Sequence, residues 1–102
     1  MKLSIIIPHH NGKKLLFDCL ESLFDNISID SFEVIVVDNH SNDGSADEAK
    51  IHFPSIHLLK SKKNLGYSGG CNFGAKKAIG EYIIFLNNDT FKFCFKYLVK
   101  FI

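Results

Sequence analysis

The sequence contains no arginine and no tryptophan, so all 12 of its basic residues are lysines, and 11 carboxylates balance them. Arginine is the side chain that recognises phosphate and guanine through paired hydrogen bonds. The formal net charge is only +1, so the chain carries no large excess of basic groups. These absences argue against nucleic acid as a partner, and we expect no nucleic-acid-binding function.

Cysteine is scarce and the apolar runs are short. Cys19, Cys71 and Cys94 lie far apart and form no CxxC pair, so the sequence predicts neither a disulfide framework nor a zinc site. The apolar run Leu3–Ile7 is too short for the core of a signal peptide or for a membrane span. We therefore expect a cytoplasmic protein.

The 102 residues, 46% hydrophobic and 23% charged, are enough for one small folded domain and too few for two. Four short runs are rich in β-branched residues. They predict buried strands, because near-continuous apolarity is typical of a sheet covered on both faces. The runs are Leu3–Ile7, Glu33–Val37, Ile56–Leu59 and Tyr82–Leu86.

Three segments between these runs predict helices. The first has Asn11 as its N-cap and one apolar stripe, formed by Leu15, Leu16, Cys19, Leu20, Leu23 and Phe24. The second begins with a capping box of Ser45 and Glu48 and ends before Pro54. The third is capped by Ser68 and stops at Gly80. Its inward-facing residues are Ala75, Ala78 and Ile79.

Strands and helices therefore alternate, starting and ending with a strand. This order predicts right-handed crossovers and a parallel sheet with helices on both faces. The expected fold class is α/β, a three-layer domain around a mostly parallel open sheet, over residues 1–90. Residues 91–102 are an atypical aromatic and lysine-rich segment. Three interpretations of it stay open: a helix docked on the sheet, a helix on a membrane surface, and a strand without its partner.

A cluster of polar residues follows each predicted strand directly. The clusters are residues 8–12, 38–45, 60–70 and 87–90. In a parallel sheet these four points lie along one edge, and open α/β sheets bind their ligands beyond that edge. We therefore expect the four clusters to surround one binding site.

The third cluster leads from a strand into a helix and continues as the glycine-rich segment 64–74. Glycines let a backbone approach a bulky anion, and the amino end of a helix offers N–H groups to phosphate oxygens. The segment matches neither the dinucleotide fingerprint nor the Walker phosphate loop. Lys62 and Lys63, just upstream, fit either an anion contact or a solvated loop.

Several acidic and histidine residues are candidates for ligand contact. Asp89 follows an apolar strand, where it could hold Mg²⁺ or Mn²⁺ together with a diphosphate, or cap a following helix. Asp38 ends the second strand, and we expect it to contact a ligand. His9 and His10 could touch a phosphate or simply finish the first strand. Asp43 fits a turn that caps the next helix.

Four motifs, in this order, resemble the N-terminal half of family 2 glycosyltransferases, which are inverting enzymes of the GT-A fold, and are most similar to the rhamnosyltransferase-like branch. They are SIIIPHHNG, VVDNHSNDGS, NLGYSGGCNFG and FLNNDT, and the resemblance spans residues 2–90. It implies the Rossmann-like nucleotide-binding half of that fold. It also implies metal-assisted transfer of a sugar from a UDP-, dTDP- or GDP-linked donor to an acceptor.

The resemblance places the donor in the cleft formed by these motifs. The candidate donor-binding residues are Pro8, His9, Asn11, Asp38, Asn64, Gly66, Gly70, Asn72, Asn87 and Asn88. Asp89 is implied as the ligand of Mg²⁺ or Mn²⁺. Asn87 stands where the family often has a carboxylate, which predicts a weaker contact from that position.

Inverting transfer needs a general base, and family members carry that carboxylate well after the motif that contains Asp89. No Asp or Glu follows Asp89 in this sequence. We therefore expect the chain to hold only the donor-binding half. Two function classes stay open: a glycosyltransferase whose base comes from another segment, and a truncated, inactive nucleotide-binding remnant. We also expect self-association through an unpaired sheet edge. Contact of residues 91–102 with the inner face of the membrane stays open as one interpretation of that segment.

Overall fold

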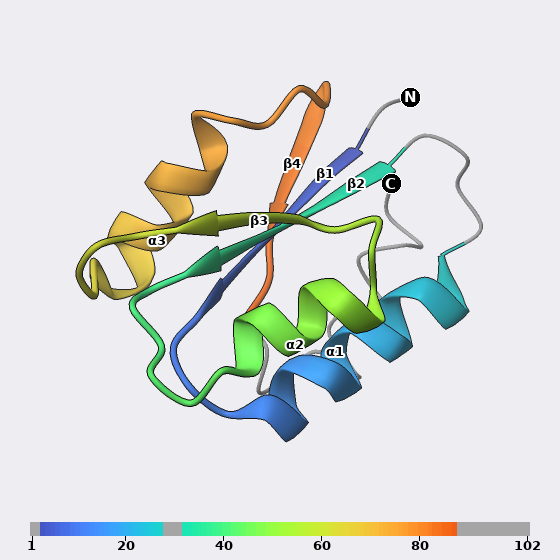
Figure 1. The fold of residues 1–102 in the computed structure, drawn as a ribbon. Coiled ribbons are helices and arrows are strands. Elements are labelled where there is room, and N and C mark those ends of the chain that lie inside the picture. The colour runs from blue at the N-terminus through green and yellow to red at the C-terminus, as the bar shows by residue number, and fades with distance from the viewer. Residues whose placement is uncertain (1–2, 28–31, 88–102) are drawn as a thin grey trace.

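The computed structural model describes residues 3–27 and 32–87 (Figure 1). Asn88, Asp89 and residues 91–102, which carry several of the predictions above, lie outside these ranges. Strands and helices alternate along the described part of the chain, in the predicted order. The elements are β1 (Leu3–His9), α1 (Lys13–Asn26), β2 (Phe32–Asp38), α2 (Ser45–His52), β3 (His57–Lys60), α3 (Gly66–Ala75) and β4 (Tyr82–Phe85).

The strands form one parallel sheet in the order β3-β2-β1-β4. Its register aligns the strand ends, because His9 pairs with Asp38 and Asp38 pairs with Lys60. The loops that follow β1, β2 and β3 therefore leave the sheet at one edge, as Figure 1 shows. The predicted α/β class with a parallel open sheet is confirmed.

Helices cover both faces of the sheet, which gives the three predicted layers (Figure 1). On β1, Ile5 and Ile7 belong to a buried cluster with α1 and α2. Ile6, between them, belongs to a second cluster with Phe73 of α3. Successive side chains of a strand point to opposite faces, so the inner strand β1 is apolar at both sets of positions.

The two outer strands differ from the prediction of burial on both faces. Tyr82, Ile83 and Phe85 of β4 are 55%, 43% and 44% exposed, and His57 and Lys60 of β3 are exposed too. Within residues 3–27 and 32–87, each outer strand has only one neighbouring strand. The prediction is correct for β1 and β2. It holds in part for β3, since Ile56 just before the strand is buried and Leu58 and Leu59 are half-buried against opposite clusters. It is wrong for β4, because an outer strand can be apolar without being covered.

Helix α3 packs directly on the two central strands. A Cβ atom on Gly74 would lie 2.5 Å from Cγ2 of Ile6 and 3.0 Å from Cγ2 of Val37. Real Cβ atoms do not approach other carbon atoms that closely, so only glycine permits this spacing. The missing side chain thus fixes the distance between α3 and the sheet.

The predicted caps of the first two helices are wrong, although the helices themselves form. The N-cap residues are Gly12 and Gly44, both in the left-handed region, with φ angles of 101° and 76° and no side-chain cap. Glu48 does not close a capping box with Ser45, since its carboxylate lies 2.6 Å from Nζ of Lys13. The Asn11 side chain instead accepts a hydrogen bond from the loop after β2, and the Ser45 hydroxyl bonds to His9 at the end of β1 and to Asp43.

The third helix begins and ends earlier than predicted. It starts at Gly66 after the N-cap residue Leu65, so Ser68 is not its cap. It ends at Ala75, and Ile79, predicted to face inward, lies beyond the helix and is 65% exposed. Gly80 is likewise outside the helix. Ala78 does pack against the Ile6 cluster, but from the loop.

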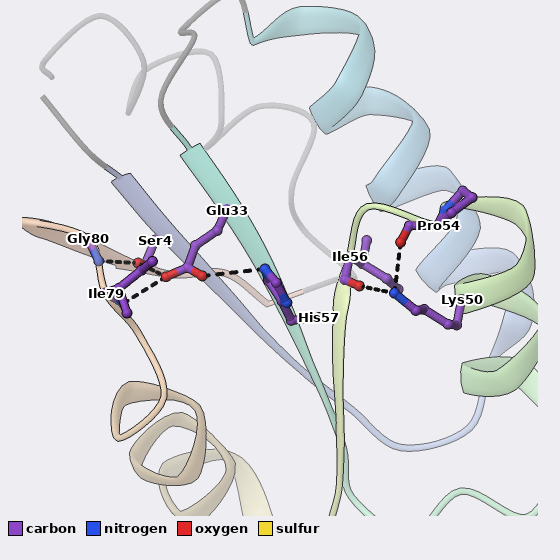
Figure 2. A network of polar contacts seen from close by, with 8 residues as sticks. All are labelled: Ser4, Glu33, Lys50, Pro54, Ile56, His57, Ile79 and Gly80. Atoms are coloured by element: carbon purple, nitrogen blue, oxygen red, sulfur yellow. Dashed lines mark hydrogen bonds and ion pairs between the residues drawn. The ribbon is translucent and has the colours of Figure 1, made fainter.

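A polar network holds the loop between α3 and β4 against the starts of β1 and β2 (Figure 2). Oε2 of Glu33 accepts hydrogen bonds from the Ser4 hydroxyl at 2.6 Å and from the Ile79 N–H at 2.8 Å. The Ser4 hydroxyl accepts one from the Gly80 N–H at 2.9 Å. This attachment lies at the opposite end of the strands from the loops that follow β1 and β2.

No helix in residues 3–27 and 32–87 has the length and apolarity needed to cross a membrane.

Candidate functional site

The loop after β1 and the loop after β2 are joined by hydrogen bonds. The Asn11 N–H donates to the Ser41 hydroxyl at 2.9 Å, and the Asn42 N–H donates to Oδ1 of Asn11 at 3.0 Å. The Gly12 N–H donates to Oδ2 of Asp43 at 2.8 Å. The predicted meeting of these two polar clusters is observed. Asn11 uses its backbone N–H and its side-chain oxygen to join the loops, which shapes the rim of the sheet.

His9, Ser45 and Asp43 form a chain of hydrogen bonds below this rim. Oδ1 of Asp43 accepts from the Ser45 hydroxyl at 2.5 Å and from the Ser45 N–H at 3.0 Å. Because the hydroxyl proton is used there, Nε2 of His9, 2.7 Å from the Ser45 oxygen, is assigned as the donor. The His9 ring is almost fully buried. Its Nε2 atom is therefore occupied inside the protein.

The environment shifts the pKa values at both ends of this chain. Burial lowers the pKa of His9, which outweighs the raising effect of the nearby Asp38 and Asp43 carboxylates. Hydrogen bonds from Ser45 and from the Gly12 N–H lower the pKa of Asp43 to about 2. His9 is therefore neutral and Asp43 ionised near neutral pH.

Asp38 ends β2 beside a hollow of about 260 Å³. Its Oδ1 atom accepts from the Ser41 N–H at 3.0 Å, which leaves Oδ2 without a protein donor among the described residues. Lys60, next to Asp38 on the neighbouring strand, also lines this hollow. It pairs with Asp47 at 2.5 Å, a contact that raises the pKa of Lys60. A carboxylate oxygen at an open hollow can accept hydrogen bonds from hydroxyl or N–H groups of a ligand.

A second hollow, of about 230 Å³, lies between the end of β1 and the start of α3. It is lined by Pro8, His9, His10, Asn39, Asn64, Gly66 and Tyr67. Oδ1 of Asn64 accepts from the Gly66 N–H at 2.9 Å, and Gly66 has a φ angle of 74°. Helix α3 therefore begins at this hollow. The glycine-rich segment predicts this position for the amino end of a helix.

Asn39 is a buried polar residue that is not among the donor-binding candidates predicted from the sequence. Its Nδ2 donates to the carbonyl of Gly66 at 3.0 Å, and its Oδ1 accepts from the Leu65 N–H at 3.3 Å. Its own N–H donates to the carbonyl of His9 at 2.7 Å. In the sequence Asn39 looks like one more residue of a polar turn; these hydrogen bonds and its exposure of only 3% distinguish it in the structure.

The structure does not bring every candidate residue to these two hollows. Gly70 is buried under the rim, where its Cβ would lie 3.1 Å from Cβ of Pro8. Asn72 lines a separate hollow of about 480 Å³ on the flank of α3, together with Phe73 and Lys76. Asn87 is exposed just after β4. Asn88 and Asp89 lie outside the described residues.

The described residues alone do not form a metal centre. Within residues 3–27 and 32–87, no three His, Cys, Asp or Glu side chains are placed to hold an ion. Magnesium and manganese are often held by one or two carboxylates together with substrate phosphates. A site of that kind needs no cluster of three protein ligands, and the predicted ligand Asp89 stays a prediction.

A sequence profile described as "Glycosyl transferase family 2" matches residues 4–92. The chain belongs to this family. Two curated glycosyltransferases illustrate the relationship. A poly(ribitol-phosphate) beta-glucosyltransferase of Bacillus spizizenii is 34% identical over 96 residues, 89% of this chain and 15% of that protein. The uncharacterized glycosyltransferase YfnE of Bacillus subtilis is 38% identical over 92 residues, 87% of this chain and 23% of its own length.

At least one solved structure has a similar fold. Staphylococcus aureus TarS in complex with UDP-GlcNAc superposes with a TM-score of 0.73 at 29% identity, covering 98% of this chain and 32% of that one. The four-stranded parallel sheet thus corresponds to the N-terminal part of GT-A structures. The poly(ribitol-phosphate) relatives are named glucosyl- and N-acetylglucosaminyltransferases, which does not support the expected closeness to rhamnosyltransferases.

Proposed function

We propose that this chain is the donor-binding part of a glycosyltransferase that uses a nucleoside diphosphate sugar. The observation that carries the proposal is the arrangement at the ends of β1 and β2. There the Asp38 carboxylate faces one hollow, and the first turn of α3 opens at the other. A carboxylate suits the hydroxyl and N–H groups of a nucleoside, and the amino end of a helix suits a diphosphate.

Asp38 and Pro8 would contact the nucleoside in this proposal. Oδ2 of Asp38 would accept a hydrogen bond from a ribose hydroxyl or a base N–H. Pro8 lines the second hollow with the half-exposed ring of Tyr67, and together they offer an apolar surface to a base. Asn64 and Gly66 would shape the backbone that receives the diphosphate.

Similarity to TarS and to the poly(ribitol-phosphate) enzymes favours UDP as the donor nucleotide. TarS, 29% identical to this chain, was solved with UDP-GlcNAc, and the poly(ribitol-phosphate) enzymes carry the names of glucosyl- and N-acetylglucosaminyltransferases. We therefore extend the proposal to a UDP-linked hexose or N-acetylhexosamine. dTDP- and GDP-linked sugars are the alternatives that a binding assay compares.

The proposal includes Mg²⁺ or Mn²⁺ bound by Asp89 and by the diphosphate. Such an ion, when bound, offsets the negative charge that develops on the leaving diphosphate. Transfer with inversion also needs a general base for the acceptor hydroxyl, and the sequence has no Asp or Glu after Asp89. For these 102 residues we therefore propose donor binding, with the base supplied from outside them.

Isothermal titration of the purified chain with UDP-GlcNAc, with and without Mn²⁺, tests this function. We expect binding that Mn²⁺ strengthens, and a loss of affinity of about tenfold or more in Asp38→Ala, since a hydrogen bond to a charged group contributes about 1.5–3 kcal/mol. Asp89→Ala should abolish the effect of Mn²⁺. Asp25→Ala, at an exposed position of α1, is the matched control.

Three outcomes would count against the proposal or a part of it. If the chain binds none of the UDP-, dTDP- and GDP-linked sugars, the donor-binding function is refuted. Binding that is indifferent to Mn²⁺ and to Asp89→Ala would refute the metal assignment alone. Hydrolysis or transfer of the sugar by these 102 residues would show that no outside base is needed.

A further inference from the structure

The two ends of α3 are attached to the sheet by different polar contacts. At the amino end, the Asn39 carboxamide binds the Leu65 N–H and the Gly66 carbonyl. Beyond the carboxyl end, Ser4 binds the Gly80 N–H (Figure 2). Only the first attachment is next to the hollow that contains Asn64 and Gly66.

Asn39 is held more firmly than a residue of an ordinary polar turn. Its N–H donates to the His9 carbonyl at 2.7 Å, and its carbonyl lies 2.7 Å from Nδ1 of His10. Its backbone is thus bound to the end of β1 while its side chain is bound to the start of α3. Asn39 therefore holds the first turn of α3 in a defined position relative to the end of β1.

Gly70 makes room for this carboxamide. A Cβ atom at position 70 would lie 2.9 Å from Nδ2 of Asn39 and 3.1 Å from Cβ of Pro8. The amide also fits its partners in chemical terms, because it supplies one donor and one acceptor to two successive residues of the chain. Neither an aliphatic side chain nor a carboxylate offers both.

We propose that Asn39 is a positioning residue of the donor site: its carboxamide fixes the first turn of α3 where the diphosphate of the donor binds. This inference rests on the proposed function. The N–H groups at the start of a helix have no acceptor within it, so they are available to an anion only if the turn is held in the correct orientation. The Gly66 N–H already donates to Asn64, which leaves the next N–H groups, of Tyr67 and Ser68, for the diphosphate.

Two ligands separate positioning of the diphosphate from general stability. UDP contains the diphosphate, whereas uridine shares only the nucleoside. NMR titration of the 102-residue chain measures both affinities, including weak ones. We expect Asn39→Ala to weaken UDP binding by about tenfold and to change uridine binding by less than about twofold.

Gly70→Ala and Ser4→Ala complete the experiment. Gly70→Ala keeps Asn39 but crowds its Nδ2 atom at 2.9 Å, more closely than Cβ of Pro8 at 3.1 Å. It should therefore weaken UDP binding more strongly than uridine binding, and it decides the question if Asn39→Ala fails to fold. Ser4→Ala is the matched control, because it too removes two hydrogen bonds, to Glu33 and Gly80, at the far end of the strands. It should lower the unfolding temperature without changing either affinity.

The outcomes distinguish this inference from the proposed function. If the unsubstituted chain binds no UDP, the proposed function fails and the role of Asn39 fails with it. If the unsubstituted chain binds UDP but Asn39→Ala and Gly70→Ala behave like Ser4→Ala, only the role of Asn39 is overturned. An equal loss of UDP and uridine affinity would also overturn it, since the effect would not be confined to the diphosphate.

Discussion

Nε2 of His9 lies 2.7 Å from the hydroxyl of Ser45, which follows it by 36 positions. His9 is the last residue of β1 and Ser45 is the first of α2. Both are buried, and the Ser45 hydroxyl donates its own hydrogen bond to Asp43. The hydrogen bond between His9 and Ser45 thus joins the end of β1 to the start of α2 below the candidate donor site.

Acidification should destabilise the fold through His9. The pKa of His9 is lowered in the folded chain, so the unfolded chain, with an ordinary value of 6.5, binds the proton more readily. The stability that the neutral His9 ring contributes to the folded chain is complete above the unfolded pKa of 6.5, and it is lost as the pH falls below that value. We expect the free energy of unfolding, measured with urea, to decline as the pH falls below 6.5.

His9→Gln should flatten that decline, because glutamine keeps an N–H donor for Ser45 but does not titrate. The same substitution at the exposed His52 provides the control. An unchanged slope in His9→Gln would show that another group causes the pH dependence.

Asp43 should control stability at lower pH. Its pKa of about 2 in the folded chain lies below the ordinary 3.8, so its contribution is present above that ordinary value and is lost as pH falls toward 2. Asp43→Ala should lower the thermal unfolding temperature at neutral pH and reduce the acid-induced loss. Circular dichroism melts measure both, and Asp25→Ala should leave them unchanged.

Gly74→Ala should be the most damaging small substitution in α3. The new methyl group would overlap Ile6 and Val37, and overpacking of a dense core costs about 1–3 kcal/mol. Urea unfolding measures this loss. Ser68→Ala, at an exposed position of the same helix, should change stability by less than about 0.5 kcal/mol. Equal stability of the two variants would contradict the close packing of α3.

Cys19 should be unreactive while the chain is folded. It is fully buried on α1, and burial raises the pKa of its thiol to about 12. Since the thiolate is the reactive form, iodoacetamide at about pH 8 should modify Cys19 only after unfolding in urea. Mass spectrometry of the peptides locates the label. Modification of Cys19 under native conditions would show that α1 opens readily.

The apolar surface of β4 should promote self-association. Ile83 and Phe85 are nearly half exposed, and neither contributes a charge that would oppose pairing of this strand with another chain. Phe85→Lys should therefore shift the chain toward the monomer in size-exclusion chromatography at high concentration. Lys60→Ala on the charged outer strand β3 is the comparison. A monomeric unsubstituted chain would disprove the prediction.

The alternation of apolar runs and amphipathic segments was sufficient to predict the parallel sheet and its three layers. Local patterns were less informative about helix ends. Asn11, Ser45 and Ser68 all have good capping side chains, yet Gly12, Gly44 and Leu65 hold the N-cap positions. The reason is that Asn11 and Ser45 form hydrogen bonds with residues about 30 or more positions away, and such partners are invisible to a local pattern.

The candidate site, too, was only partly predictable, because some of its features depend on contacts between distant residues. The order of the elements places Asp38, Asn64 and Gly66 at one edge of the sheet, because parallel strands end together. The burial of His9 and the separation of Asn72 from the two hollows depend on which way each side chain points. The role of Asn39 depends on Leu65 and Gly66, which approach it only after α3 has docked.

The sequence by itself determined the fold class, the family and the chain segments that meet at the strand ends, since these follow from periodicity and from motifs that are contiguous in the chain. Only the tertiary structure decided which polar atoms are used within the protein and which face a hollow. That division is physical: a hydrogen bond between distant residues depends on the packing of the layers, and no short stretch of sequence encodes it.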